Sequence, residues 1–96
     1  MIKVIKENNV ITISGHANND VYGKDIVCAS VSSIIYTTIN DIEVVRKSSI
    51  SVEDNKSMII EILTDDEVVN KLINNMMNLL KDLQKDYPKN ILVKES

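Results

Sequence analysis

The sequence predicts an α+β fold: a single small domain with elements in the order ββαββαβ, an antiparallel-rich sheet and two helices packed on one face. Three observations predict this class. Short β-branched runs flank turn residues in pairs, which is typical of antiparallel hairpins. Two longer segments carry apolar residues at helical spacing. The chain has 96 residues, enough for one core and too few for two ordinary domains. We therefore expect one domain, residues 1–96.

The first two predicted strands are residues 2–6 and 10–14, and they are joined by a turn at Asn8 and Asn9. Asparagine tolerates positive φ, so this pair favours a tight hairpin turn. Because side chains alternate between the faces of a sheet, the two isoleucines of the second strand should share one face, opposite its other residues.

The next periodic segment predicts a helix from about Asp25 to Lys47. Asp25 is a candidate N-cap residue, since its carboxylate can accept from the first-turn N–H groups. Cys28 would then lie in the first turn. The segment is rich in β-branched residues, so burial rather than helix propensity must hold it. Its predicted apolar stripe is Val27, Val31, Ile34, Thr38, Ile42 and Val45, broadened by Ile35 and Ile39.

A second predicted hairpin joins a strand around Ile50 and Val52 to a strand over residues 58–63, with a turn at 54–56. These strands again alternate short apolar runs with polar turn residues. A last strand, 91–93, is expected at the edge of the sheet.

The second helix is predicted to begin near Thr64, because Thr64 and Glu67 have the spacing of a capping box. It should end near Asp86, since Pro88 cannot continue a helix. Met76 and Met77 are expected in the core or on a dimer surface. The predicted buried stripe is Val69, Leu72, Ile73, Met76, Leu80 and Leu83.

The composition excludes several classes of function. The chain has no Phe or Trp, so aliphatic residues and Met must fill a small core, and dimerisation would bury more apolar surface. The net charge is −3 and the lysines are scattered, which argues against nucleic-acid binding. One cysteine cannot form an internal disulfide, and paired Cys and His ligands for a metal are lacking, so we expect neither metal nor cofactor. No apolar run is long enough to span a membrane. We expect a soluble cytoplasmic protein.

The segment from Ser14 to Ser32 contains the only histidine, the only cysteine and both glycines. His16 follows a predicted strand and Cys28 lies near a predicted helix start. The N–H groups of a helix N-terminus stabilise a thiolate, and a nearby imidazole can take the thiol proton. The same N–H groups could donate to the oxyanion formed when a thiolate attacks a carbonyl. The pattern indicates a nucleophilic cysteine.

Other interpretations of these residues stay open on residue types alone. A lone cysteine on an apolar helix is usually a small buried hydrophobe, and a lone histidine in a polar loop is usually exposed. Two roles are open for Asp25: it caps the helix only, or it also orients His16. Ser32 could hydrogen-bond the thiolate or satisfy a helix carbonyl. Tyr22 could be a core plug at the end of a loop, and both glycines could be simple turn residues.

Three blocks of this segment resemble the signature of the ribosomal-processing cysteine protease Prp family: Ser14-Gly15-His16-Ala17, then Tyr22-Gly23, then Asp25-Ile26-Val27-Cys28-Ala29 with Val31-Ser32. The resemblance implies a cysteine endopeptidase that removes the N-terminal extension from the precursor of the twenty-seventh protein of the bacterial large ribosomal subunit. Cleavage is expected after a phenylalanine.

The resemblance also assigns roles. His16 and Cys28 would be the catalytic dyad. Asp25 and Ser32 would support the site, with Gly15 and Ala17 flanking the histidine. A loop over residues 17–24, including Tyr22 and Gly23, would cover the site, and the protein would be a homodimer.

The sequence departs from the family pattern at Ser30, where relatives carry Ala or Gly, and residues 18–21 match no pattern. Two rival functions are a non-catalytic ribosome-assembly or peptide-binding module of the same fold, and a redox sensor. The redox sensor lacks a second cysteine to resolve a sulfenic acid.

Overall fold

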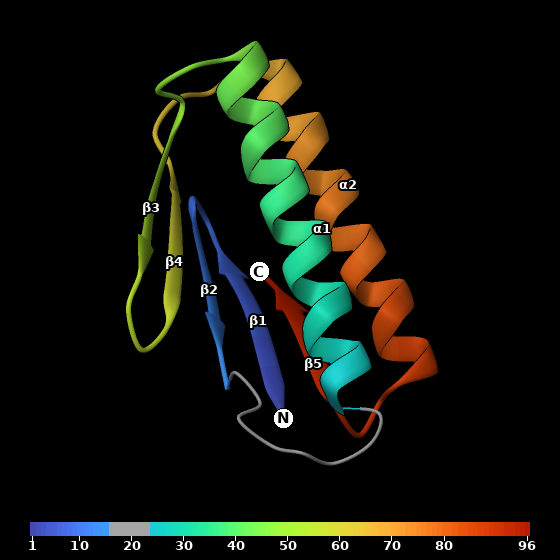
Figure 1. Cartoon of the computed structure of the whole chain (residues 1–96). Helices are drawn as coiled ribbons and strands as arrows, with labels where there is room; N and C mark the ends of the chain where they lie inside the picture. The colour runs from blue at the N-terminus through green and yellow to red at the C-terminus, as the bar shows by residue number, and fades with distance from the viewer. Residues whose placement is uncertain (16–23) are drawn as a thin grey trace.

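The computed structural model describes residues 1–15 and 24–96, without the side chains of Lys24 and Asp25. The elements follow the predicted ββαββαβ order (Figure 1). They are β1 (Ile2–Glu7), β2 (Val10–Ser14), α1 (Lys24–Val45), β3 (Ile50–Asp54), β4 (Met58–Ile62), α2 (Glu67–Asp86) and β5 (Ile91–Glu95).

The strands form one five-stranded sheet in the order β3-β4-β2-β1-β5. The pairs β1–β2, β2–β4 and β3–β4 are antiparallel, and only β5 pairs in parallel, with β1. Figure 1 shows α1 and α2 side by side across one face of this sheet. The predicted α+β class and the edge position of the last strand are therefore confirmed.

The first hairpin turns where the sequence predicts it. Asn8 has φ of 54°, and the strand register pairs Glu7 with Val10 across the turn. Ile11 and Ile13 are buried while Val10 is exposed, which confirms the predicted alternation.

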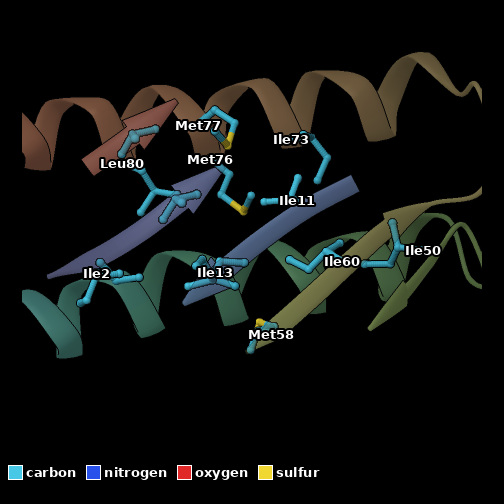
Figure 2. Close-up of a cluster of buried hydrophobic side chains, with 14 of the residues drawn as sticks. Ile2, Ile11, Ile13, Ile50, Met58, Ile60, Ile73, Met76, Met77 and Leu80 are labelled. Carbon is cyan, nitrogen blue, oxygen red and sulfur yellow. The ribbon is translucent and has the colours of Figure 1, made fainter. Parts of the chain in front are cut away.

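The core lies between the sheet and the two helices, and Figure 2 shows its isoleucines, methionines and Leu80 gathered there. Met76 and Met77 are both fully buried, so they belong to the core. Flexible methionines can fill the gaps that the absent large aromatics leave. One prediction for α1 is wrong: Val45 is 46% exposed, because it is the last residue of the helix, where the chain leaves the packed layer, whereas Ile42 one turn earlier is fully buried.

The boundaries of α1 also differ from the prediction. The helix begins at Lys24 and ends at Val45 rather than near Lys47. Its last hydrogen bond is donated by the Arg46 N–H to the Ile42 carbonyl, and Ser48 then has φ of 67°. This left-handed residue turns the chain towards β3, so the helix stops two residues early.

The N-cap of α2 is Asp66, so the capping box predicted from Thr64 is wrong. The Asp66 carboxylate accepts from the Val68 N–H at 2.8 Å and the Val69 N–H at 3.1 Å. The chain needs residues 63–65 to turn from β4 to the helix axis, which leaves Thr64 too early to cap. The helix ends at the predicted Asp86.

The Val69 N–H lowers the pKa of Asp66 below its ordinary value, and so do the side chain of Arg46, 3.0 Å away, and the Val68 N–H. A carboxyl whose pKa is lower in the folded state stabilises the fold above its unfolded pKa. That contribution is lost as the pH falls through the folded pKa.

We predict that Asp66→Ala lowers the free energy of unfolding at neutral pH, because two N–H groups lose their acceptor. Asp66→Asn, which keeps an oxygen acceptor but no charge, should lose less. Urea unfolding from neutral to strongly acidic pH measures both effects. The gap between wild type and Asp66→Asn should close in acid, and a gap that stays constant with pH would contradict the role of the charge.

Candidate active site

Cys28 is the fifth residue of α1, two positions later in the helix than the predicted N-cap at Asp25 implies and just past the predicted first turn, because α1 already includes Lys24 and Asp25. Its side chain is half-buried and packs against the core cluster. Side chains in a helix lean towards the N-terminus, so the Cys28 side chain is directed over the first turn. The first N–H groups of a helix have no partner within the helix. An anion on this side chain would therefore lie close to the positive end of α1.

The rotation of α1 about its own axis follows from its buried residues. Val27, Val31 and Ile35 face the core. With about 100° per residue, positions 28 and 32 then lie on one flank, between the buried stripe and solvent. Both Cys28 and Ser32 are half-buried, as this position requires.

A hydrogen bond of Tyr36 shows which strands lie next to the flank of α1 that carries Cys28. Tyr36 lies two turns beyond Cys28 on the same side of α1, and its hydroxyl donates to Asp54 Oδ2 at 2.5 Å, at the end of β3. The hydrogen bond to Asp54 raises the pKa of Tyr36. The flank that carries Cys28 therefore faces the β3–β4 hairpin, and the other flank of α1 faces α2. No local sequence pattern indicates this contact, because 18 positions separate the two residues.

Gly15 directly follows β2 and has a backbone conformation that other residues rarely adopt. Its φ is +77°, and a Cβ built on it would overlap the carbonyl oxygen of Met1. Both the φ value and the close approach to the first strand require glycine here. Gly15 is therefore a conformational requirement at the point where the chain leaves the sheet towards His16.

Three parts of the chain meet at this end of the molecule. Ser14 pairs with Lys3, and the Ile2 N–H donates to the Asn90 carbonyl at 2.9 Å. Figure 1 shows the end of β2, the first residue of the chain and the start of α1 at the same end. The fold thus brings the residues on either side of the segment 16–23 to one end of the sheet.

Several predicted site residues lie outside the described residues: His16, Ala17, Tyr22 and Gly23. The contact between His16 and Cys28 and the role of the loop over residues 17–24 stay predictions. Asp25 is the second residue of α1 rather than the residue before it, so the N-cap assignment does not match the helix boundary. An acidic residue in the first turn still favours the helix dipole.

The described part of the chain offers no group of three or more His, Cys, Asp or Glu residues that could hold a metal ion. None of its helices is both long enough and apolar enough to cross a membrane.

Comparisons with known proteins identify the family of this chain. The model of the cysteine protease Prp family matches residues 1–92. The chain therefore belongs to the cysteine protease Prp family. No curated protein matches the chain.

Solved structures share the fold over almost the whole chain. A Streptococcus mutans protein, SMU.848, is 25% identical with a TM-score of 0.84, over 98% of this chain and 90% of that one. The essential ribosomal processing protease Prp of S. aureus, in complex with a covalently linked product peptide, is 18% identical with a TM-score of 0.83. Its complex with a substrate peptide is 18% identical with a TM-score of 0.84. Both cover 99% of this chain and 97% of the S. aureus chain.

We predict that Gly15→Ala lowers the free energy of unfolding by about 2 kcal/mol or more, because the new Cβ adds both backbone strain and a clash with Met1. Ser14→Ala is the matched control, since the neighbouring residue has ordinary strand geometry and should change stability by less than about 1 kcal/mol. Urea unfolding at neutral pH measures both. Equal midpoints for Gly15→Ala and wild type would show that the backbone is not constrained at this position.

Proposed function

We propose that the chain is a cysteine endopeptidase in which Cys28 is the nucleophile and His16 the general base and acid. Its proposed substrate is the precursor of the twenty-seventh protein of the bacterial large ribosomal subunit, from which it removes the N-terminal extension. One observation carries the proposal: the only cysteine of a Prp-family chain is half-buried near the start of α1, on the flank that faces the β3–β4 hairpin.

The chemistry requires only a thiol and an imidazole. His16 takes the Cys28 proton, and the thiolate attacks the carbonyl carbon of the scissile bond. The tetrahedral intermediate collapses when the imidazolium gives its proton to the leaving amine, which leaves a thioester on Cys28. His16 then takes a proton from water, the hydroxide attacks the thioester, and the thiol leaves with that proton. No metal or cofactor takes part in these steps.

The start of α1 supports the charged species along this path. Its unpaired N–H groups can stabilise the thiolate and donate to the oxyanion of each tetrahedral intermediate. Ser32, one turn beyond Cys28, can donate to the sulfur, and Asp25 can orient His16. Gly15 and Ala17 flank the histidine, and Tyr22 and Gly23 belong to the segment that we propose contacts the substrate.

The proposed domain organisation, oligomeric state and location are those that membership of the family implies. We propose that residues 1–96 form one protease domain that acts as a homodimer in the bacterial cytoplasm, where the precursor is made, without binding nucleic acid directly. Two solved structures of one relative of the same fold, S. aureus Prp, are complexes with a substrate peptide and with a covalently linked product peptide, which supports a peptide as the ligand class.

We predict that the purified protein cleaves a peptide spanning the processing site of the precursor, after a phenylalanine. Cys28→Ala and His16→Ala should each reduce turnover below detection while the far-UV circular dichroism spectrum stays that of the wild type. Mass spectrometry of the products gives the cut site. Ser30→Ala, on the same helix but outside the proposed dyad, is the matched control and should cleave at the wild-type rate. Cleavage that persists in Cys28→Ala would remove the nucleophile assignment.

A second candidate function is a non-catalytic ribosome-assembly or peptide-binding module. The observation that favours it is the packing of Cys28 against the core cluster, as a structural cysteine would pack. Such a module would bind the precursor without cutting it, and its thiol would react slowly.

We predict that iodoacetamide alkylates Cys28 faster at neutral pH than it alkylates glutathione, because a helix N-terminus and an imidazole both favour the thiolate. His16→Ala should slow the reaction at neutral pH, because the imidazole that takes the thiol proton is lost. The rate, followed by intact mass, tests this. A rate that is unchanged in His16→Ala, and no faster than that of glutathione, would favour the non-catalytic module.

A further inference from the structure

We propose that the free edge of β3 binds the precursor peptide as an added strand. The part of the peptide several residues from the scissile bond pairs with β3, while the scissile bond lies at Cys28. The proposal rests on the proposed function, because it describes how the substrate binds at the same site.

The sheet has two edge strands, and α2 covers only one of them. In β5 the Val93 N–H donates to the side chain of Gln84 on α2, and Glu95 pairs with Lys81 of the same helix at 2.6 Å. Such cover is one way in which proteins protect an edge strand from pairing with another chain. β3 lies at the opposite edge of the sheet, away from α2 (Figure 1).

The register between β3 and β4 shows which backbone groups of β3 are already paired. The Leu63 N–H donates to the Ser49 carbonyl at 2.8 Å, and these residues continue the β3–β4 register by one position. Hydrogen-bonded pairs alternate along an antiparallel ladder. The next residues of β3 that bond to β4 are therefore Ser51 and Glu53.

The other residues of β3, Ile50, Val52 and Asp54, direct their N–H and C=O groups away from the sheet. Within residues 1–15 and 24–96, no group bonds to these atoms of Val52. A row of unpaired backbone groups is a template for an extended peptide, which can join the sheet as one more strand.

An exposed strip with apolar side chains lies between this edge and α1. Val52 is opposite the buried Ile60, so its side chain is on the helix-covered face of the sheet, and it is 39% exposed. The Asp54 side chain reaches Tyr36, which is 49% exposed. The half-buried Ile39 lies further along the same flank of α1. Alternate side chains of an added strand would contact this strip.

The strip leads to the proposed nucleophile. Cys28 lies two turns before Tyr36 on the same flank of α1, which is about 11 Å along the helix axis. An extended peptide spans this length in about three or four residues. β3 then continues for five residues, Ile50–Asp54. With the scissile bond at Cys28, peptide residues about four to eight positions away would lie beside β3.

The charges around the edge fit a basic peptide. The flank of α1 next to β3 consists of Cys28, Ser32, Tyr36, Ile39 and Glu43. Neither this flank nor β3 contains Lys or Arg, whereas Glu43, Glu53 and Asp54 are exposed carboxylates. Lys56 follows in the turn after β3. Proteins that bind RNA carry Lys and Arg against its phosphates, so the precursor of a ribosomal protein has the complementary charge.

Charged side chains can also keep an edge strand unpaired. The charges of β3, however, are directed away from its outward row. Glu53 belongs to the residues on the open face of the sheet, because its neighbours along the strand face the helices. Tyr36 holds the Asp54 carboxylate towards α1. The outward groups of Val52 therefore stay accessible to a peptide.

Val52→Pro tests the proposal, because it removes an outward N–H and leaves the bonds to β4 in place. Proline is tolerated on an edge strand at such a position. Both measurements use Cys28→Ala, which cannot cut the peptide, and a fluorescein-labelled peptide that spans the processing site of the precursor. The dissociation constant from fluorescence anisotropy should rise about fivefold or more with Val52→Pro. Val52→Thr, which keeps the N–H and the branched shape, is the matched control and should leave it unchanged. Circular dichroism verifies that each variant folds.

A second series changes only the peptide, so it does not depend on the folding of Val52→Pro. Single N-methyl groups are placed on each residue four to eight positions from the scissile bond, on both sides of it. Alternate residues of an added strand bond to β3. The dissociation constant should therefore rise at every second position on one side of the scissile bond, and KM for cleavage by the wild type should follow the same alternation.

The proposal is overturned if the peptide does not bind, if a folded Val52→Pro variant binds it as tightly as its parent, or if N-methylation shows no alternation on either side. A changed sedimentation coefficient for Val52→Pro with unchanged peptide affinity would assign this edge to a second copy of the chain. Failure of the proposed function gives a different result: the peptide binds with the alternation, but the wild type does not cleave it. Cleavage without the alternation would retain the peptidase and remove the strand pairing.

Discussion

The burial of one stripe of α1 against the sheet is the constraint on which the rest of this structure depends. The helix is rich in β-branched residues, which have modest helix propensity, so packing of Val27, Val31, Ile35 and Ile42 must hold it. Burial of these four side chains fixes the rotation of the helix about its axis. The rotation in turn determines on which side of α1 each remaining residue lies, including Cys28.

Methionines from the sheet and from α2 help to fill the core of a chain that has no Phe or Trp. Methionines at 58, 76 and 77 reach into the space between the layers, and Figure 2 shows them among the isoleucines. Aliphatic cores of this size give limited stability, so single contacts at the ends of the sheet matter. The carboxylate cap at Asp66 and the tight approach of Gly15 to Met1 are such contacts.

The sequence predicts those parts of the fold that depend on local patterns. Alternation along β2, the Asn8 turn and the end of α2 before Pro88 each follow from residues a few positions apart. The predictions that are wrong concern features that depend on how distant parts of the chain pack together. Thr64 has the spacing of a cap, but the path from β4 to α2 makes Asp66 the cap. Val45 fits the apolar period of α1 but is the last residue of the helix and is exposed.

In the candidate site, too, local patterns predict some features, and contacts between distant residues determine the others. The position of Cys28 near a helix start follows from local periodicity, and in the structure it lies two positions further into the helix than the predicted N-cap implies. The tie between Tyr36 and Asp54 and the approach of Gly15 to Met1 join residues that are far apart in the sequence, so no local pattern reveals them. The assignment of His16 as the partner of Cys28 comes from family resemblance, since residue types alone left its role open.

The geometry of α1 also determines which side of the helix carries the proposed nucleophile. Cys28 lies on the flank that faces the β3–β4 hairpin, whereas Ala29 and Ser33 lie on the outer side. In the proposed peptidase, a peptide would therefore approach Cys28 from the hairpin side. Because the buried residues Val27, Val31 and Ile35 set the rotation of α1, a change in their packing would also change the direction of the Cys28 side chain.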